Sequence, residues 1–337
     1  MAIKALPVSV PASAPFPETL CGAGDLPAWV RRELSRLHAA LLRSGAVLLR
    51  GFALQDPAQF AEAAELIAGP LDVEYEGPSP RTALGAPGVY TASEVTGKVA
   101  IAEHAELSYM PTMPRHVFFW CRQPAAFLGG TTIVDGRRVL ARLDPERIAS
   151  LRAGLRIRRR HARAVGPHDP FELKRWTLGF GQTREAALER ARALGFHARF
   201  ERDGSLTLEH TQPALRVHPE TGEEAWLNHL LVFHASAPAA VLDQPLASPA
   251  LRRLAQLYRA AMPRLGREVA SDVSLPDGTP IDDETVAHVR EAIIDETVAV
   301  RWRAGDLLIV DNHIALHGRQ PYRGAREVIA AWSKARA

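Results

Sequence analysis

The segment GDLLIVDNHIALHGRQPYRGAR, residues 305–326, joins an apolar run to a cluster of histidines and arginines. Its first part, DLLIVDN, is typical of a buried β-strand, because its apolar residues are continuous and the run is short. After this strand we expect a turn that holds His313 and His317. The loop that follows contains Gly, Pro and three arginines: Arg319, Arg323 and Arg326. A histidine behind an apolar strand is commonly a core residue, so this segment predicts a site only together with a second one.

The second segment is VAIAEHAELSY, residues 99–109, in which His104 and Glu106 stand two positions apart. We predict a β-strand here, and side chains on a strand alternate between its two faces. His104 and Glu106 are then expected to point to the same side and to reach one metal ion. The tripeptide alone is a weak signal, because three residues match by chance in many proteins.

The rest of the sequence predicts a β-rich chain with a few helices. At the N-terminus a strand at 46–52 lies between helices at 27–44 and 56–69, the second with Asp56 as N-cap. Further strands are expected at 88–92, 99–109, 116–123, 131–136 and 326–332, and the segment 299–318, which includes the strand and turn described above, is β-like. Hairpins are expected at 197–210 and 214–228, and helices at 184–195, 251–262 and 283–294. We therefore predict a mostly β (α+β) fold: a double-stranded β-helix, or jelly roll, with N-terminal helices and a helical and hairpin insertion.

We expect one domain. The chain has 337 residues, 47% of them hydrophobic, which is enough for one large core. Residues 1–20 are predicted to be a Pro-rich leader and residues 21–337 the single domain, since no internal repeat divides them.

Taken together, the two segments indicate a metal site. Closure of a jelly roll brings distant strands together, so His104 and Glu106 are expected to meet His317. Two histidines and one carboxylate are the facial triad of non-haem Fe(II) oxygenases, which leaves positions open for a co-substrate and oxygen. An arginine behind the distal histidine matches the carboxylate of a dicarboxylic co-substrate with two parallel hydrogen bonds.

Two stretches also resemble a known family. HAELSYMPTMPRHVFFWCRQPAAFLGGTTIVDG, residues 104–136, and DNHIALHGRQPYRGAR, residues 311–326, are similar to the taurine-dioxygenase and clavaminate-synthase superfamily, and most of all to its branch of syringomycin-biosynthesis hydroxylases. The resemblance covers roughly residues 40–335. It implies a jelly-roll enzyme that uses Fe(II), 2-oxoglutarate and O2.

The resemblance also assigns residues. His104, Glu106 and His317 match the family's iron ligands, with His317 preferred over His313. Thr132, in GGTT, and Arg326 match the groups that bind 2-oxoglutarate, and Arg323 remains a rival for the arginine. Related halogenases lack the acidic ligand, so its presence implies hydroxylation, with desaturation or cyclisation by the same chemistry as the alternative.

The branch implies a substrate that is an amino acid or is derived from one, free or tethered to a carrier protein, in specialised metabolism. Arg81 and Glu94 are candidates to bind a substrate carboxylate and ammonium, although each is more simply loop surface. Asn228 lies in a motif of this branch. The basic run LRIRRRHARA, residues 155–164, is expected to be a charge-protected edge strand, with docking of an acidic carrier as the alternative. A non-catalytic jelly roll that kept the ligands is the rival from another class.

Other function classes find no support. The 41 Lys and Arg nearly balance the 38 Asp and Glu, so nucleic acid is not expected as a partner. Cys21 and Cys121 are too few for a disulfide framework or a Cys-rich metal site, and a zinc deaminase would need Pro-Cys-x-x-Cys after the His-x-Glu. No apolar stretch predicts a secretory signal or a membrane span, so we expect a cytoplasmic protein. His229 and His234 are interpreted as core residues before pocket residues.

Overall fold

The computed structural model describes residues 15–334 apart from 74–80, 111, 163–174, 238–248, 251 and 258–270. The described chain opens with β1 (Glu18–Cys21), α1 (Leu26–Ser44), β2 (Ala46–Arg50) and α2 (Pro57–Ala68). Both predicted helices are confirmed, and the Asp56 carboxylate caps α2 by accepting from two backbone amides. β1 pairs in parallel with β2, so residues 18–20, which we assigned to the leader, belong to a sheet.

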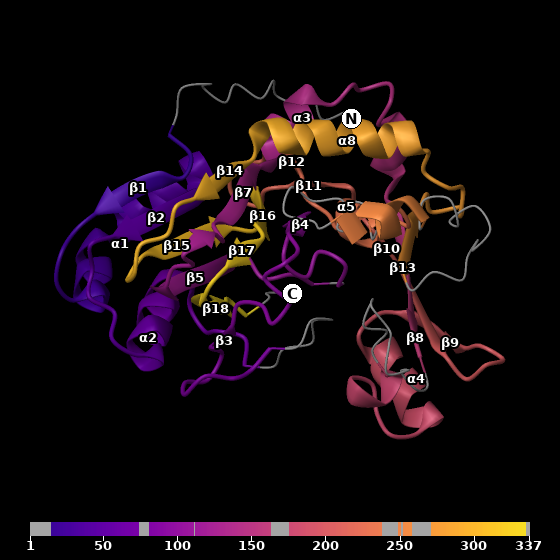
Figure 1. The fold of residues 1–337 in the computed structure, drawn as a ribbon, viewed down its shortest axis with the longest axis horizontal. Coiled ribbons are helices and arrows are strands. Elements are labelled where there is room, and N and C mark those ends of the chain that lie inside the picture. The colour runs from indigo at the N-terminus through magenta and orange to yellow at the C-terminus, as the bar shows by residue number, and fades with distance from the viewer. Residues whose placement is uncertain are drawn as a thin grey trace.

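Two sheets form the jelly roll that the sequence predicts. The larger has the order β1-β2-β15-β5-β18-β3 and the smaller has the order β14-β7-β16-β4 (Figure 1). Their further strands are β15 (Leu307–Asp311), β5 (His116–Gln123), β18 (Glu327–Trp332) and β3 (Tyr90–Thr91) in the first, and β14 (Val298–Val300), β7 (Thr131–Asp135), β16 (Ala315–Arg319) and β4 (Ile101–His104) in the second. Sequence neighbours such as β15 and β16 therefore lie in different sheets.

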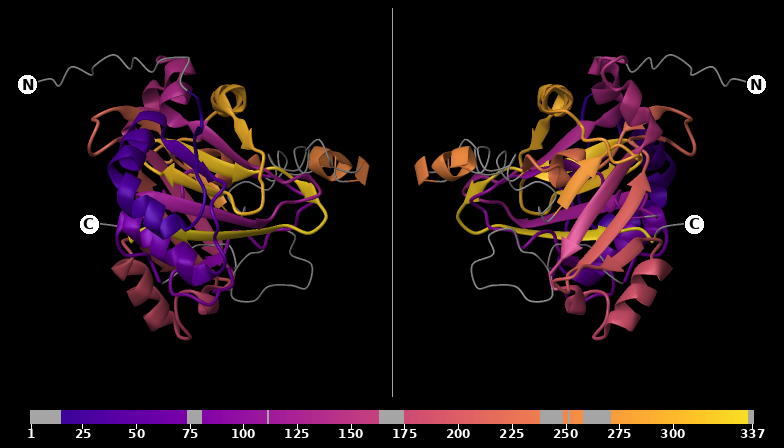
Figure 2. Two further views of the ribbon diagram at one scale, coloured as in Figure 1. Left: turned by 90° about the vertical axis from the view of Figure 1, so that its left-hand side faces the viewer. Right: turned by 90° about the vertical axis from the view of Figure 1, so that its right-hand side faces the viewer.

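The apolar run of β15 is buried on both faces. Leu307 and Ile309 pack with the core residues of α1 and α2, whereas Leu308 and Val310 pack with residues of the smaller sheet. The two helices cover the outer face of the larger sheet (Figure 2). This double burial explains why the strand shows continuous apolar character and no polar alternation.

The insertion forms a third sheet with the order β13-β8-β10-β9. Its strands are β8 (Leu155–His161), β9 (His197–Phe200), β10 (Leu206–Gln212) and β13 (Ser271–Ser274), and α4 (Arg184–Ala193) precedes β9. The predicted hairpin at 197–210 is confirmed. The prediction of an edge strand for the basic run is wrong, because β8 is paired on both sides; the end of that run, from residue 163, lies outside the described residues. Arg156 pairs with Glu209 of β10, and Arg160 pairs with Asp203. These acidic partners allow a charged strand to lie inside the sheet.

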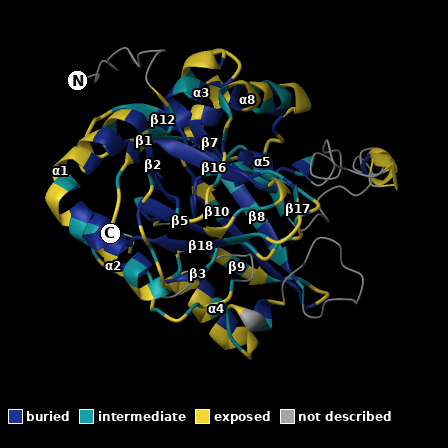
Figure 3. Cartoon of the chain, turned by 60° about the vertical axis from the view of Figure 1, so that its left-hand side comes forward, coloured by how far each residue is buried: buried dark blue, intermediate teal, exposed yellow. Residues whose placement is uncertain are grey.

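The remaining elements frame the sheets. They are β6 (Phe127–Leu128), α3 (Gly136–Arg142), β11 (Leu215–Val217), β12 (Glu224–Trp226), α5 (Leu230–Phe233), α8 (Asp283–Glu296) and β17 (Tyr322–Arg323). Of the helix predicted at 251–262, residues 252–257 are helical and the rest lies outside the described residues. Burial is concentrated in the strands, while the outer faces of the helices are exposed (Figure 3). None of the helices described here is long and apolar enough to cross a membrane.

Candidate active site

Two antiparallel neighbours in the smaller sheet, β4 and β16, carry the two histidines of the predicted triad. His104 lies opposite His317, with the ring centroids 4.6 Å apart. His317 is thus on a strand and not in the turn that we predicted. Gly318 allows this close pairing, because a Cβ at that position would lie 2.5 Å from the carbonyl oxygen of Ile101.

Glu106 does not lie on the strand that we predicted for residues 99–109. β4 ends at His104, and residues 106–109 form a turn in which Leu107 has a φ of 54°. The alternation of a strand is therefore the wrong explanation for the convergence of the pair. The turn directs the Glu106 carboxylate back, so that Oε2 lies 3.3 Å from Nε2 of His317 and 3.9 Å from Nε2 of His104.

These three side chains offer a compact donor set for a metal ion. One ligand atom from each of His104, Glu106 and His317 lies within 4.8 Å of the others, and among the described residues no other group of His, Cys, Asp and Glu does so. Nδ1 of His104 bonds to the carbonyl oxygen of Ala102 at 2.8 Å, which fixes the tautomer and leaves Nε2 free for a metal. Two imidazole nitrogens and one carboxylate fit Fe(II) with open positions.

The charges of the triad also suit a metal. Burial raises the pKa of Glu106, but the charge of Arg81 and the hydrogen bond from His317 outweigh it and hold that pKa well below its usual range. Burial, and then the charge of His317, lowers the pKa of His104 to about 4. The site therefore presents an ionised carboxylate and a neutral imidazole at neutral pH, which are the forms that bind metals.

Asn312 holds the turn that carries Glu106, and sequence reasoning missed it. Its side-chain oxygen accepts from the backbone amide of Glu106 at 2.8 Å, and its amide nitrogen donates to the carbonyl oxygens of Glu106 and Pro114 at 2.9 and 2.8 Å. The side chain is fully buried. A polar residue that closes the apolar run DLLIVD was the only signal in the sequence.

Next to the triad lies a small cavity of about 70 Å3, and Arg326 is part of its wall. The Arg326 guanidinium donates to the carbonyl oxygen of Gly129 at 2.8 Å and to Oγ1 of Thr131 at 3.5 Å. Burial lowers the pKa of Arg326, and no described carboxylate pairs with it. A buried cation without a counter-ion is costly, so this position calls for an anionic ligand. Arg323, the rival, is exposed on β17.

Thr131, and not Thr132, faces this cavity. Successive side chains of β7 point to opposite faces, and among the described residues Thr131 lines the cavity while Thr132 does not. The Thr132 hydroxyl points to the other face of the sheet and lies close to Gly318 of β16, where an added Cβ would be 2.7 Å from it. The structure thus differs by one residue from the position that the resemblance implied.

The three substrate candidates lie in different surroundings. The Arg81 side chain is only 9% exposed, lines the cavity, and places Nη2 3.3 Å from Oε1 of Glu106. Glu94 is exposed, and its carboxylate accepts from the hydroxyls of Thr82 and Thr91. Asn228 is buried, and its hydrogen-bond partners in the described chain are backbone groups. Its side chain donates to the carbonyl oxygen of Ala214 and accepts from the backbone amide of Leu230, the first residue of α5. Of the three, Arg81 alone belongs to the iron cavity.

A cluster of aromatic and polar residues covers the other side of His104. The His229 ring lies 4.9 Å from that of His104, and its Nδ1 shares a 2.6 Å hydrogen bond with the hydroxyl of Ser108. Tyr109 and Phe233 pack against the same His229 ring. His229 is therefore a core residue of the site itself. His234 pairs with Ser236 and has no part in this cluster of described residues.

Comparison with known proteins decides the family. The model of the taurine catabolism dioxygenase TauD, TfdA family matches residues 12–332. The chain belongs to this family. It is accordingly an Fe(II)- and 2-oxoglutarate-dependent dioxygenase, with O2 as the second co-substrate, and the resemblance in the sequence is confirmed at this level.

Relatives agree with this assignment. The dapdiamide synthesis protein DdaC of Enterobacter agglomerans is 30% identical over 293 residues, which is 86% of this chain and 82% of that protein. A clavaminate synthase-like protein of Arabidopsis thaliana is 26% identical over 90% of this chain and 86% of its own. The crystal structure of PvcB from Pseudomonas aeruginosa has a TM-score of 0.52 at 15% identity, covering 94% of this chain and 86% of that one, which shows the shared fold.

Proposed function

We propose that this dioxygenase hydroxylates an unactivated C–H bond of an amino acid or an amino-acid derivative in specialised metabolism. The observation that carries the proposal is the complete triad with its acidic ligand, Glu106, beside a buried and uncompensated Arg326. The name of the dapdiamide synthesis protein supports a role in the synthesis of a specialised product. Assignment to the syringomycin-biosynthesis branch is part of this proposal.

In this proposal His104, Glu106 and His317 hold Fe(II). Arg326 and Thr131 bind the far carboxylate of 2-oxoglutarate, with Thr131 taking the role that we first gave to Thr132. When bound, iron and O2 convert 2-oxoglutarate to succinate and CO2 and supply the oxidant that removes hydrogen from the substrate. The chain's own contribution is to orient both molecules and to keep water out of the cavity.

Glu106 supports hydroxylation over halogenation, because its carboxylate occupies the position that a halide would need. Desaturation or cyclisation needs the same protein groups and differs in how the substrate is held. The product spectrum of one turnover distinguishes these outcomes. A non-catalytic binding protein with the same ligands would release no succinate at all.

Arg81 is our candidate for the substrate carboxylate. Its guanidinium lies at the mouth of the triad, where it contacts Glu106 and the carbonyl oxygen of Ala92, at 2.5 Å. It also lies 5.1 Å over the Trp332 ring, which fixes its plane. Glu94 and Asn228 are no longer part of the substrate proposal, because Glu94 is exposed and Asn228 serves the backbone.

A carrier protein is not needed for this proposal. The arginines that point outward from β8 already have acidic partners, since Arg156 pairs with Glu209 and Arg160 with Asp203. These ion pairs weaken the support for docking of an acidic carrier on this face, and the docking hypothesis can be tested. Reversal of charge at Arg158 and Arg160 should leave turnover of a free substrate unchanged and lower turnover of a carrier-bound one only if the carrier docks here.

The experiment for the proposal is a substrate screen. The enzyme loaded with Fe(II) is given 2-oxoglutarate, O2 and single amino acids or their derivatives, and succinate and the mass of the product are measured. We expect at least one of them to raise succinate release and to gain one oxygen atom. If all of them leave succinate release at the substrate-free level, the substrate class is wrong. Anaerobic binding of Fe(II) and 2-oxoglutarate, seen as a visible absorption band, checks the cofactor site separately.

A further inference from the structure

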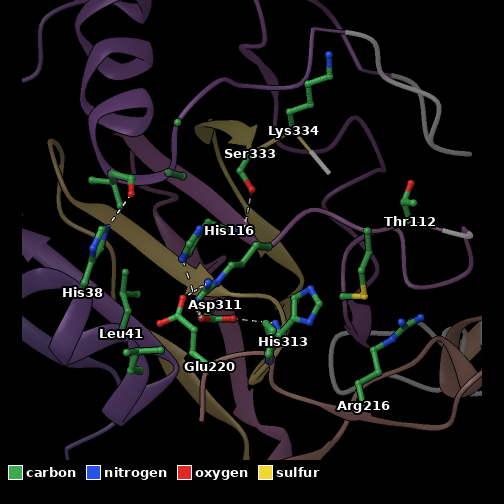
Figure 4. A pocket seen from close by; sticks show the side chains of 17 residues that line it. His38, Leu41, Thr112, His116, Arg216, Glu220, Asp311, His313, Ser333 and Lys334 are labelled. Atoms are coloured by element: carbon green, nitrogen blue, oxygen red, sulfur yellow. Dashed lines mark hydrogen bonds and ion pairs between the residues drawn. The ribbon is translucent and has the colours of Figure 1, made fainter. Parts of the chain in front are cut away.

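A second and larger cavity, of about 760 Å3, lies at the ends of α1 and α2, beside the β11–β12 hairpin and the end of β18 (Figure 4). This volume is typical of a small-molecule pocket. Among the described residues none lines both this cavity and the iron cavity. Its polar wall comprises His38, Thr112, Arg115, His116, Arg216, Glu220, Asp311, His313, Ser333 and Lys334.

Asp311 organises the polar wall but has no free bonding capacity. Its Oδ2 accepts from Nε2 of His218 at 3.2 Å, and its Oδ1 accepts from the backbone amide of His313 at 2.9 Å. The Arg115 guanidinium lies 3.6 Å from the same carboxylate and pairs with Glu220 as well. Both acidic residues of the wall are thus partnered by groups of the chain.

The remaining polar lining has two cations, Arg216 and Lys334, and two imidazoles, those of His116 and His313, that face the cavity. Nε2 of His116 lies 4.0 Å from Oδ2 of Asp311, and the ring nitrogens of His116 and His313 make no hydrogen bond to any described residue. Arg216 has no acidic partner in the described chain, and its Nε is buried without a hydrogen bond. Lys334, which is exposed at the rim, adds a second positive charge to that of Arg216. A buried donor such as Nε of Arg216 is costly without a partner, so this part of the lining points to an acceptor that the described residues do not supply.

The cavity also has apolar lining. It is formed by residues of α1 and α2 and by the loop before β5: Leu41, Leu42, Ile67, Ala68 and Met113. With Arg115, Arg216 and Lys334 against Glu220 and Asp311, the wall has one positive charge in excess. A ligand that balances this charge and contacts the apolar residues has one negative charge and an apolar part.

We propose that this cavity is a second binding site, which takes a small organic monoanion with a carboxylate or phosphate group and an apolar tail. The anion is held by Arg216, Lys334 and the imidazoles of His116 and His313. This site is separate from the proposed hydroxylation and does not depend on it.

Two connections join the second cavity to the iron site. Asn312, which holds the Glu106 turn, lies in the chain between Asp311 and His313. Arg216 donates to the carbonyl oxygen of Ser108 at 3.2 Å, in the same turn. A ligand that orders Arg216 and His313 therefore also stabilises the turn that presents Glu106, so its binding is expected to favour retention of iron.

The test uses the holoenzyme with Fe(II) and 2-oxoglutarate under anaerobic conditions. Hexanoate and inorganic phosphate are titrated separately by calorimetry, which distinguishes a carboxylate with a tail from a bare phosphate. We expect hexanoate to bind and its affinity to fall about tenfold in Arg216→Gln and in Lys334→Ala. Lys334 is exposed, so its variant folds even if Arg216→Gln does not. Arg122→Gln, which removes a distant surface cation, is the matched control and should bind like the parent.

Three outcomes would overturn the proposal. The first is that neither probe binds. The second is that affinity is the same in both variants as in the control. The third is that Arg326→Ala, and not Arg216→Gln, removes binding, because the anion then occupies the iron cavity. As the readout of coupling, hexanoate should slow the loss of Fe(II) to a chelator by about fivefold, and Lys334→Ala should reduce this protection.

Discussion

The iron site and the Asp311 cluster contain the same kinds of residue, yet among the described residues only the first offers a donor set for a metal ion. Each has a carboxylate beside histidines and an arginine, and the loop from β15 to β16 contributes to both. In the iron site, Oε2 of Glu106 lies 3.3 Å from Nε2 of His317, and three ligand atoms share one small space. In the other cluster, both oxygens of Asp311 accept from groups of the chain, at 2.9 and 3.2 Å.

The difference lies in how the backbone presents each carboxylate. Asp311 ends a strand, so its short side chain bonds the amide of His313 two residues on, in a common turn arrangement. Glu106 stands in a turn and its backbone amide donates to Asn312, so its carboxylate faces the histidines and Arg81. The residue types alone therefore do not define a metal site. What matters is whether the carboxylate oxygens point toward the histidine nitrogens.

The largest expected effect separates the two carboxylates. Glu106→Ala removes the only acidic ligand of the triad and should lower succinate formation by about 1000-fold or more, since a bound metal contributes several kcal/mol to catalysis. Asp311→Asn should keep iron and turnover while it lowers the free energy of unfolding by roughly 1 to 3 kcal/mol. Iron content, succinate release and thermal unfolding of both variants check this. Normal turnover in Glu106→Ala would falsify the iron assignment.

The next effect concerns Arg323 and Arg326, two of the three arginines that follow His317. Arg326→Ala should raise the apparent KM for 2-oxoglutarate by about 30-fold or more, which corresponds to about 2 to 5 kcal/mol for the loss of one partner of a buried charge pair. Arg323→Ala is the matched control, because Arg323 is exposed and should change KM by less than about twofold. Initial rates of succinate release against 2-oxoglutarate concentration give both values. The reverse result would assign the co-substrate to Arg323.

Much of the iron site was predictable from sequence because its residues stand in short local patterns. His104, Glu106 and His317 occur in motifs, and the structure brings them together. What could not be predicted were the details that long-range contacts decide. The pairing of β4 with β16 is formed between residues more than 200 positions apart, and it ends the strand before Glu106. The face of β7 that meets the cavity is likewise decided by its pairing with distant strands, and Thr131 lies on that face.

Asn312 provides a third test, because it bonds the Glu106 turn from the edge of the Asp311 cluster. Asn312→Ala removes three buried hydrogen bonds and should lower the free energy of unfolding by about 2 to 4 kcal/mol. It should also weaken Fe(II) binding by about 10- to 100-fold, the usual cost of losing an outer-shell partner. Metal titration and chemical denaturation measure the two effects. Stability that falls while iron affinity stays unchanged would show that Asn312 only supports the fold.

The fold was predicted best where burial alone decides it. Continuous apolar runs identified β15, β5 and β18, apolar residues at helical spacing identified α1, and the N-cap Asp56 marked the start of α2. The basic strand β8 was placed at an edge because a sequence does not show its partners. In the structure Glu209 of β10 lies near Arg156 and compensates its charge, and Arg159 is 4.6 Å from the Tyr109 ring. Such compensation comes from segments distant in sequence.

A pH titration of stability sharpens the view of the second cluster. Burial lowers the pKa of His116 to about 4, opposed by the charge of Asp311 and assisted by Arg115, His38 and His313. Between pH 6.5 and 4 the unfolded chain therefore binds a proton that the folded chain does not, so stability falls as pH decreases in this window. His116→Gln should remove about 2 to 3 kcal/mol of that loss. Denaturant unfolding across the window measures it, with His197→Gln on exposed β9 as control. An unchanged slope in His116→Gln would mean that His116 does not contribute.

The smallest effect tests which face of β7 serves the co-substrate in the iron site. Thr131→Val removes the hydroxyl that lies 3.5 Å from Arg326, and it should raise the apparent KM for 2-oxoglutarate by about fivefold, or roughly 1 kcal/mol for one hydrogen bond. Thr132→Val is the matched control of equal size on the opposite face, and it should leave KM within about twofold. Since both variants keep the β-branched shape of a strand residue, neither should disturb the sheet. A larger KM change in Thr132→Val would mean that the co-substrate binds on the face of β7 that carries Thr132, as the sequence motif implied. The cavity beside Arg326 would then not be the 2-oxoglutarate site.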